Sequence, residues 1–279
     1  MPVRLPRLHL RSISLEVAKW ATVAPSRRRV AVPYVLPVTV VVLAIAALLW
    51  HGPVAQLAHY HDFADQRSWF GIAHAADVLS NLGFAFVGLQ GLRRVIQWWD
   101  APALRPGRDG WAVFFCALLL TSVGSAWYHL APDDARLVWD RLPIALACAG
   151  ILAAVWRETV GAGRWITPAL VAFAVASVAW WRITDLHGTG DLRPYLFLQF
   201  LPLVLVPLLQ WQHEVPVLER LAFAGAMGLY VLAKIFEWAD HAVLHALVLV
   251  SGHTIKHLLA ALSAALISWG LGWRLWQTR

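Results

Sequence analysis

The chain has 279 residues, of which 59% are hydrophobic and 14% charged, and its mean hydropathy is +0.60. This composition excludes a soluble globular domain and indicates a membrane protein with several spans. The net charge of +7 does not indicate a nucleic-acid-binding protein, because most basic residues lie in alternate loops between apolar runs.

Eight apolar runs have about the length needed to cross the hydrocarbon core of a membrane. A basic tail at 1–32 precedes the first run, 33–50, which we expect to be a retained helix because no small-residue cleavage site precedes it. The other spans are predicted at 74–97, 111–131, 139–159, 164–183, 194–211, 219–237 and 253–275. Two cysteines, Cys116 and Cys148, lie inside these runs, which excludes a disulfide framework.

The sequence therefore predicts an all-α membrane protein in three parts. Residues 1–32 form a basic cytoplasmic tail, and residues 33–58 form one additional N-terminal transmembrane helix with its connection. Residues 59–279 form a seven-helix transmembrane core. No linker, composition shift or internal repeat divides this core.

The charges of the loops predict the orientation. The tail, the loop at 93–108 and the residues Arg157, Arg164, Arg274 and Arg279 place basic groups at one set of span ends. The alternate loops carry acids: Asp62, Asp65, Asp133, Asp134, Asp185, Asp191 and Asp240. Because basic loops face the cytoplasm, both termini are predicted to be cytoplasmic, and an even number of spans agrees with this.

Polar residues within the spans gather at the predicted non-cytoplasmic ends. They are Asn81, Ser125, His129, Asp140, His253 and His257. An ionisable residue at membrane depth is costly, so it is a functional-site candidate by default. Residues from separate spans at one leaflet are what a single buried site requires.

The spacing of these residues indicates a metal centre. Ser125 and His129 are four positions apart, as are His253 and His257, so each pair shares one helix face. Three histidines with an open fourth position are typical of a catalytic zinc site. Asp140 could act there as general base and acid, and Ser125 could donate to a developing oxyanion.

A plainer interpretation stays open at this point. Histidines four apart also arise by chance, and His241 with His245 repeats the spacing. The histidines would then only form hydrogen bonds between helices. The sequence also leaves open a transporter with an intramembrane proton relay, which predicts inverted repeats and broken helices near the midplane, and neither is evident.

Three motifs together resemble the signature of a known family. They are DVLSN at 77–81 with the following NLGFAFVG, GSAWYH at 124–129 with the downstream WDRLP, and GHTIKHLLAAL at 252–262. In order, spacing and position at span ends they resemble the alkaline ceramidases. That family belongs to a superfamily of seven-helix membrane hydrolases that includes the progestin and adiponectin receptor-like proteins. The resemblance covers residues from about 60 to 275.

The resemblance implies roles for particular residues. It implies that His129, His253 and His257 hold zinc, that Asp140 assists catalysis and that Ser125 supports the site. The implied reaction is hydrolysis of the amide bond of ceramide, or of a related N-acyl lipid within the bilayer, to a sphingoid base and a fatty acid. We expect supporting positions around the ligands at Asn81, Asp77, Asp240 and His241, and at Glu237 and His245 near the mouth.

The sequence departs from the family at two places. The Asp-Glu-Leu-Pro of the family is here Asp140-Arg141-Leu142-Pro143, so one acid has become a base, which could alter the preferred lipid head group. Members with a calcium site carry a Trp-Cys-Glu pattern where this chain has HDFADQRSW. Calcium bound by Asp62, Asp65 and Asp77 is therefore left open rather than predicted.

The sequence thus predicts a zinc-dependent amidase, integral to the membrane, with a lipid substrate and a site near the non-cytoplasmic face. The alternative is a metal-containing receptor or sensor of the same superfamily that performs no turnover. Acyl-chain length and oligomeric state are not indicated by the sequence.

Overall fold

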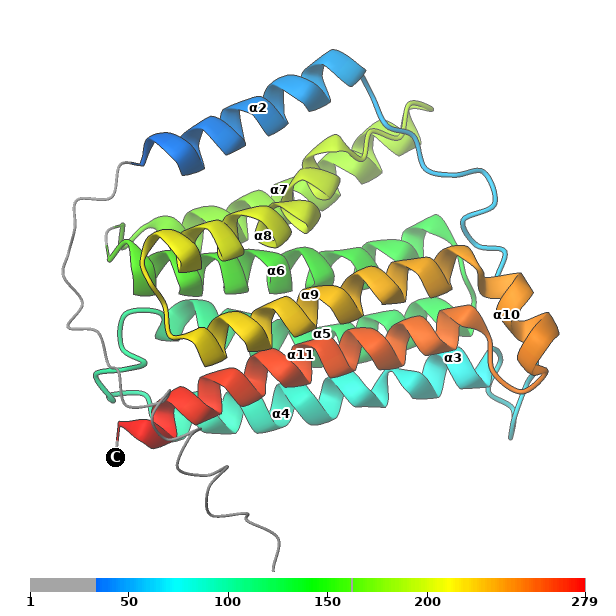
Figure 1. The fold of residues 1–279 in the computed structure, drawn as a ribbon. Coiled ribbons are helices and arrows are strands. Elements are labelled where there is room, and N and C mark those ends of the chain that lie inside the picture. Colours follow the sequence, from blue (N-terminus) through cyan, green and yellow to red (C-terminus); the bar gives the residue numbers. More distant parts are fainter. Residues whose placement is uncertain (1–33, 162, 279) are drawn as a thin grey trace, which may run out of the picture. The chain divides into compact units, whose positions relative to one another are not determined.

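The computed structural model describes residues 34–161 and 163–278 (Figure 1). Its elements are the helices α2 (Val35–His51), α3 (Ala75–Ser80), α4 (Leu82–Gln97), α5 (Arg108–Leu130), α6 (Asp134–Thr159), α7 (Ile166–Leu186), α8 (Arg193–Gln212), α9 (Val217–Trp238), α10 (Asp240–Leu247) and α11 (Gly252–Gln277). The basic tail predicted at 1–32 lies outside the described residues.

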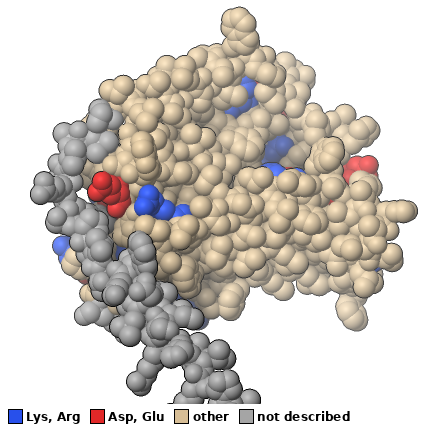
Figure 2. Space-filling view, in the orientation of Figure 1, with Lys and Arg blue, Asp and Glu red and all other residues tan. Residues whose placement is uncertain are grey.

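Among the described residues, seven helical stretches are long and apolar enough to cross a membrane: Ala75–Gln97 (α3 with α4), α5, α6, α7, α8, α9 and α11. Large apolar side chains such as Phe86, Val123 and Trp211 are exposed on their outer faces. The face seen in Figure 2 carries only a few charged residues. Exposed apolar surface of this extent is typical of contact with lipid. The structure therefore supports an all-α integral membrane protein.

Helix α2 differs from these seven. It is apolar but only 17 residues long. It packs along α8, and the Leu192 N–H donates a 2.8 Å hydrogen bond to the Val54 carbonyl just beyond α2. Its assignment as an additional transmembrane helix stays a prediction.

The helix ends differ from the predicted spans in informative places. The fourth span begins at Asp134 rather than at 139, because the side chain of Asp133 accepts a hydrogen bond from the Arg136 N–H and caps α6. The second span is divided at Asn81 into α3 and α4. The polar segment before the last span, expected to be a loop, contains the short helix α10.

Two glycines allow close helix contacts beside the candidate site. A Cβ on Gly124 of α5 would overlap the Trp139 carbonyl oxygen of α6. A Cβ on Gly252, the first residue of α11, would overlap the Phe236 carbonyl of α9 and lie 2.7 Å from the Asp240 Cα. Glycine at these positions lets the backbones touch. The contacts therefore fix where Ser125 and His253, the next residues along the chain, stand.

A buried ion cluster joins helices at the other end of the bundle. Arg274, near the end of α11, donates two 2.6 Å hydrogen bonds to Glu158 of α6 and one of 3.1 Å to Glu219 of α9. The indole N–H of Trp111 on α5 donates to Glu158 at 2.7 Å. Four helices therefore meet at Glu158 and Arg274. The start of α11 and helices α3 and α10 lie at the opposite end of the bundle (Figure 1).

Candidate metal centre

Three histidines from two helices meet at that opposite end. His129 lies in the last turn of α5, and His253 and His257 lie in the first two turns of α11. One nitrogen from each ring lies within 4.8 Å of the others, and the Nε2 atoms of His129 and His253 are 3.3 Å apart. All three residues are buried, with exposed fractions of 1%, 5% and 2%. Among the described residues, 34–161 and 163–278, these three histidines form a group that could hold a metal ion.

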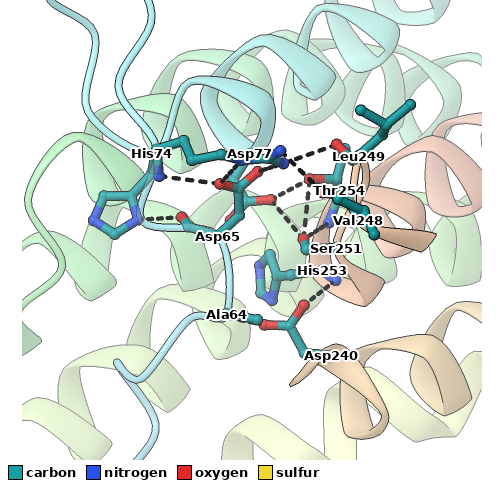
Figure 3. A network of polar contacts seen from close by, with 11 residues as sticks. Ala64, Asp65, His74, Asp77, Asp240, Val248, Leu249, Ser251, His253 and Thr254 are labelled. Carbon is teal, nitrogen blue, oxygen red and sulfur yellow. Dashed lines mark hydrogen bonds and ion pairs between the residues drawn. The ribbon is translucent and has the colours of Figure 1, made fainter. Parts of the chain in front are cut away.

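Local structure fixes the positions of the two histidines on α11. Ser251 caps the helix by accepting a 3.0 Å hydrogen bond from the Thr254 N–H. The N–H of His253 donates to Asp240 Oδ1 at 2.7 Å, and Asp240 Oδ2 accepts from the Ala64 N–H at 2.9 Å (Figure 3). Four-residue spacing then brings His257 onto the face that His253 occupies. Asp240 therefore supports the site through the backbone of His253.

Ser80 orients the ring of His257. Its Oγ donates to the Asp77 carbonyl at 2.8 Å and lies 2.8 Å from His257 Nδ1. A hydroxyl has one proton, so Ser80 must accept from Nδ1–H. This tautomer leaves the Nε2 lone pair of His257 available to a metal, and such outer hydrogen bonds commonly position metal-binding histidines. Sequence reasoning missed Ser80, although it follows Asp77 by three residues in DVLSN.

Asp77 and Asn81 flank Ser80 in the sequence, and both are buried. Asp77 Oδ1 accepts hydrogen bonds from the hydroxyls of Thr254 and Ser251 (Figure 3). The Asn81 side-chain amide donates to the Asp77 carbonyl at 2.8 Å. Asp77 thus connects α3 to the first turn of α11 and does not itself join the three histidines.

The side-chain ammonium of Lys256 lies beside His253. The Lys256 Nζ is 3.0 Å from His253 Nε2 and 2.9 Å from Glu237 Oε1, and Lys234 donates to the other oxygen of Glu237 at 2.6 Å. Glu237, expected near the mouth of the site, therefore holds Lys256 against the centre. A metal ion on His253 Nε2 would replace the Lys256 contact at that nitrogen.

Phe63 covers the histidines from the loop before α3. Its ring centroid lies 4.7 Å from that of His129 and 4.4 Å from that of His253. Phe63 is itself buried. Sequence reasoning did not identify it, because a single apolar residue in a polar loop shows no periodicity.

The predicted catalytic residues Ser125 and Asp140 lie on the two helices that touch at Gly124 and Trp139. Both are buried, and each is the residue that follows the contact on its own helix. His129 lies one turn beyond Ser125, and its Nδ1 is buried without a hydrogen-bond partner in the described part of the chain. The structure therefore places Ser125 and Asp140 on neighbouring helices at the end of the bundle that carries the histidines.

Other predicted positions lie outside the centre. His241 is exposed, and its ring contacts Asp62, with Nε2 3.2 Å from the Asp62 carbonyl, rather than the three histidines. The acids considered for calcium form no metal-binding group in the described part of the chain either. Asp65 accepts two 2.7 Å hydrogen bonds from Arg67, which hold the pKa of the Asp65 carboxyl below its ordinary value. Asp62 is exposed, and the Asp77 carboxylate accepts a hydrogen bond from the Thr254 hydroxyl.

No protein-family model and no curated protein sequence matches the chain. Its function is therefore inferred from the geometry of the histidines and of the residues around them.

Proposed function

We propose that the chain is a zinc-dependent amidase of the alkaline-ceramidase type, which hydrolyses ceramide or a related N-acyl lipid to a sphingoid base and a fatty acid. The observation that carries this proposal is the meeting of His129, His253 and His257 inside a bundle of membrane-spanning helices. Imidazole nitrogens are preferred ligands of zinc, and three of them leave one position open for chemistry.

The donor set fits zinc in spacing and in hydrogen bonding. Two ligands about 2.1 Å from a tetrahedral zinc ion lie about 3.4 Å from one another. The Nε2 atoms of His129 and His253 are 3.3 Å apart. Ser80 leaves the Nε2 of His257 unprotonated, as a ligand must be. The widest separation in the group, within 4.8 Å, would contract when the three rings share one ion.

Each residue of the proposed site then has a separate role in amide hydrolysis. Zinc, when bound by the three histidines, supplies Lewis-acid polarisation of the amide carbonyl and lowers the pKa of water. Asp140 would take a proton from the attacking water and pass it to the departing amine nitrogen. The hydroxyl of Ser125 would donate a hydrogen bond to the carbonyl oxygen as negative charge develops on it. Phe63 would exclude bulk water from the two rings it covers.

The bilayer gives the substrate its access. The histidines lie where α5 ends and α11 begins, and the charged cluster of Arg274 lies at the other end of α11. Basic loops at the Arg274 end, read by the positive-inside rule, would place the histidines near the non-cytoplasmic face and both termini in the cytoplasm. A two-chained lipid could then reach the site without leaving the membrane.

Replacement of His253 tests the proposal. Purified protein would be analysed for bound zinc and for release of fatty acid from a labelled N-acyl lipid. We expect His253→Ala to lose both, because one of three ligands is gone, and Asp140→Asn to keep zinc while losing turnover. Wild-type protein that binds zinc but releases no fatty acid from any N-acyl lipid would contradict the amidase and favour the receptor or sensor. Full activity of His253→Ala without metal would contradict the zinc site.

A further inference from the structure

The residue after Asp140 is a buried arginine without an acidic partner. Arg141 lies in the second turn of α6 and is 2% exposed, and none of the ion pairs among the described residues involves it. Its guanidinium carbon lies over three aromatic rings, 4.0 Å from the centroid of Trp181, 4.9 Å from Tyr60 and 5.5 Å from Tyr195. A buried charge without a partner is strongly unfavourable, so its retention requires an explanation.

The aromatic rings compensate only part of this charge. Cation–π contacts attract the cation as a whole, whereas the N–H groups of a guanidinium still need acceptors. Arg141 Nε and Nη1 are buried and have no hydrogen-bond partner in the described part of the chain, and the same holds for the indole Nε1 of Trp181. Every unsatisfied group here is a donor. The missing component is therefore an acceptor, and beside an uncompensated cation it is an anionic oxygen.

This donor cluster is connected to the metal centre by a continuous set of rings. Tyr60 lies against Arg141 and contacts His61, which in turn contacts Tyr128, the neighbour of His129. Phe63, Tyr128, Trp181 and Tyr195 belong to the same buried cluster. A ligand held by Arg141 would therefore contact the same buried cluster of rings that adjoins the histidines.

We propose that Arg141 and Trp181 bind the anionic oxygens of the substrate's head group. The preferred substrate is then an N-acyl lipid with a phosphate, carboxylate or sulfonate near its amide, rather than neutral ceramide. This assignment rests on the proposed function, since it names the substrate class of the same site. The guanidinium would supply charge and planar donors, and the indole N–H would supply one further hydrogen bond.

Two lipids that differ only in head-group charge test the assignment in the full-length protein. We expect kcat/KM for ceramide 1-phosphate to exceed that for ceramide of the same acyl chain roughly 10- to 100-fold, the size of charge-assisted hydrogen bonding. Arg141→Met should remove this preference, mainly through KM for the phosphorylated lipid, with a smaller loss of kcat/KM for ceramide. Equal losses on both lipids would instead assign Arg141 a purely structural role and overturn the proposal.

Trp181→Phe is the matched variant, because it keeps an aromatic ring and removes only the Nε1 donor. It should reduce the preference for the phosphorylated lipid by a few-fold, with a smaller effect on kcat/KM for ceramide. Arg141→Lys should give an intermediate preference, because an ammonium keeps the charge and lacks the planar fork. Full preference in both Trp181→Phe and Arg141→Met would contradict the donor cluster.

Thermal unfolding separates this proposal from that of the amidase. Ceramide 1-phosphate should raise the Tm of wild-type protein more than ceramide does, and Arg141→Met should lose the difference. If neither lipid is hydrolysed and this difference is present, the amidase is wrong and the anion site stands. Equal Tm values with the two lipids would overturn the anion site. Inorganic phosphate that raises Tm as much as the lipid would assign the site to a soluble anion and overturn the head-group assignment.

Discussion

Replacing Ser80 with alanine tests the outer support of the metal centre with very little change in volume. The Oγ of Ser80 takes part in two 2.8 Å hydrogen bonds, one to the Asp77 carbonyl and one from His257 Nδ1. Ser80→Ala removes both and leaves the Nδ1–H of a buried ring without an acceptor. Loss of such a partner typically lowers metal affinity by about 10- to 100-fold. In free energy this is about 1.4 to 2.8 kcal/mol.

The assay is competition for zinc between the purified protein and a chelator of known affinity at constant pH. Ser177→Ala is the matched control, because Ser177 is also buried and its hydroxyl donates a 2.8 Å hydrogen bond to the Ala174 carbonyl within α7. We expect Ser177→Ala to keep wild-type zinc affinity and Ser80→Ala to lose at least a factor of about 10. Equal affinities of the two variants would refute the argument that Ser80 sets the tautomer of His257.

Two further predictions concern stability. Arg274→Met removes the cation that pairs with the buried carboxylates of Glu158 and Glu219, and should lower the free energy of unfolding in mixed micelles by about 3–5 kcal/mol. Asp100→Asn, at an exposed ion pair, should lower the free energy of unfolding by less than about 1 kcal/mol. Similar losses in the two variants would contradict a larger contribution from the buried ion cluster. Because Arg67 lowers the pKa of Asp65, their pair should stabilise the fold above the ordinary aspartate pKa of 3.8 and lose this contribution as pH falls through the lowered value. As pH falls below the ordinary aspartate pKa of 3.8, the Tm of wild-type protein should therefore fall more steeply than that of Arg67→Met, and parallel curves would contradict the assignment.

The apolar runs predicted most of the helical core, because length and hydropathy alone distinguish a membrane-spanning helix. The helix ends were less predictable. The prediction began the fourth span at 139, since Asp134 and Arg136 look like loop residues, whereas a cap at Asp133 extends α6 by more than one turn. Helix α10 was missed because eight mixed residues give a weak periodic signal.

The three histidines were accessible to sequence reasoning because four-residue spacing and position at a span end are both visible in the chain. Their surroundings were not. Ser80 acts through a hydrogen bond to a residue 177 positions away, and Phe63 acts from an irregular loop. The burial of Arg141 depends on Trp181 and other rings from separate elements. Such contacts arise from tertiary packing and leave no pattern along the sequence.

Asp240 has a mechanical consequence for access to the histidines. Its two carboxylate oxygens each take one backbone N–H, from Ala64 in the loop that carries Phe63 and from His253 on α11. The side chain of Asp240 therefore links the loop to α11 through these two hydrogen bonds. A displacement of Phe63 away from the rings would also move Asp240 and, through it, the backbone of His253. Uncovering the three histidines would therefore disturb their positions, which favours a path for the proposed lipid substrate between helices over a path through the loop.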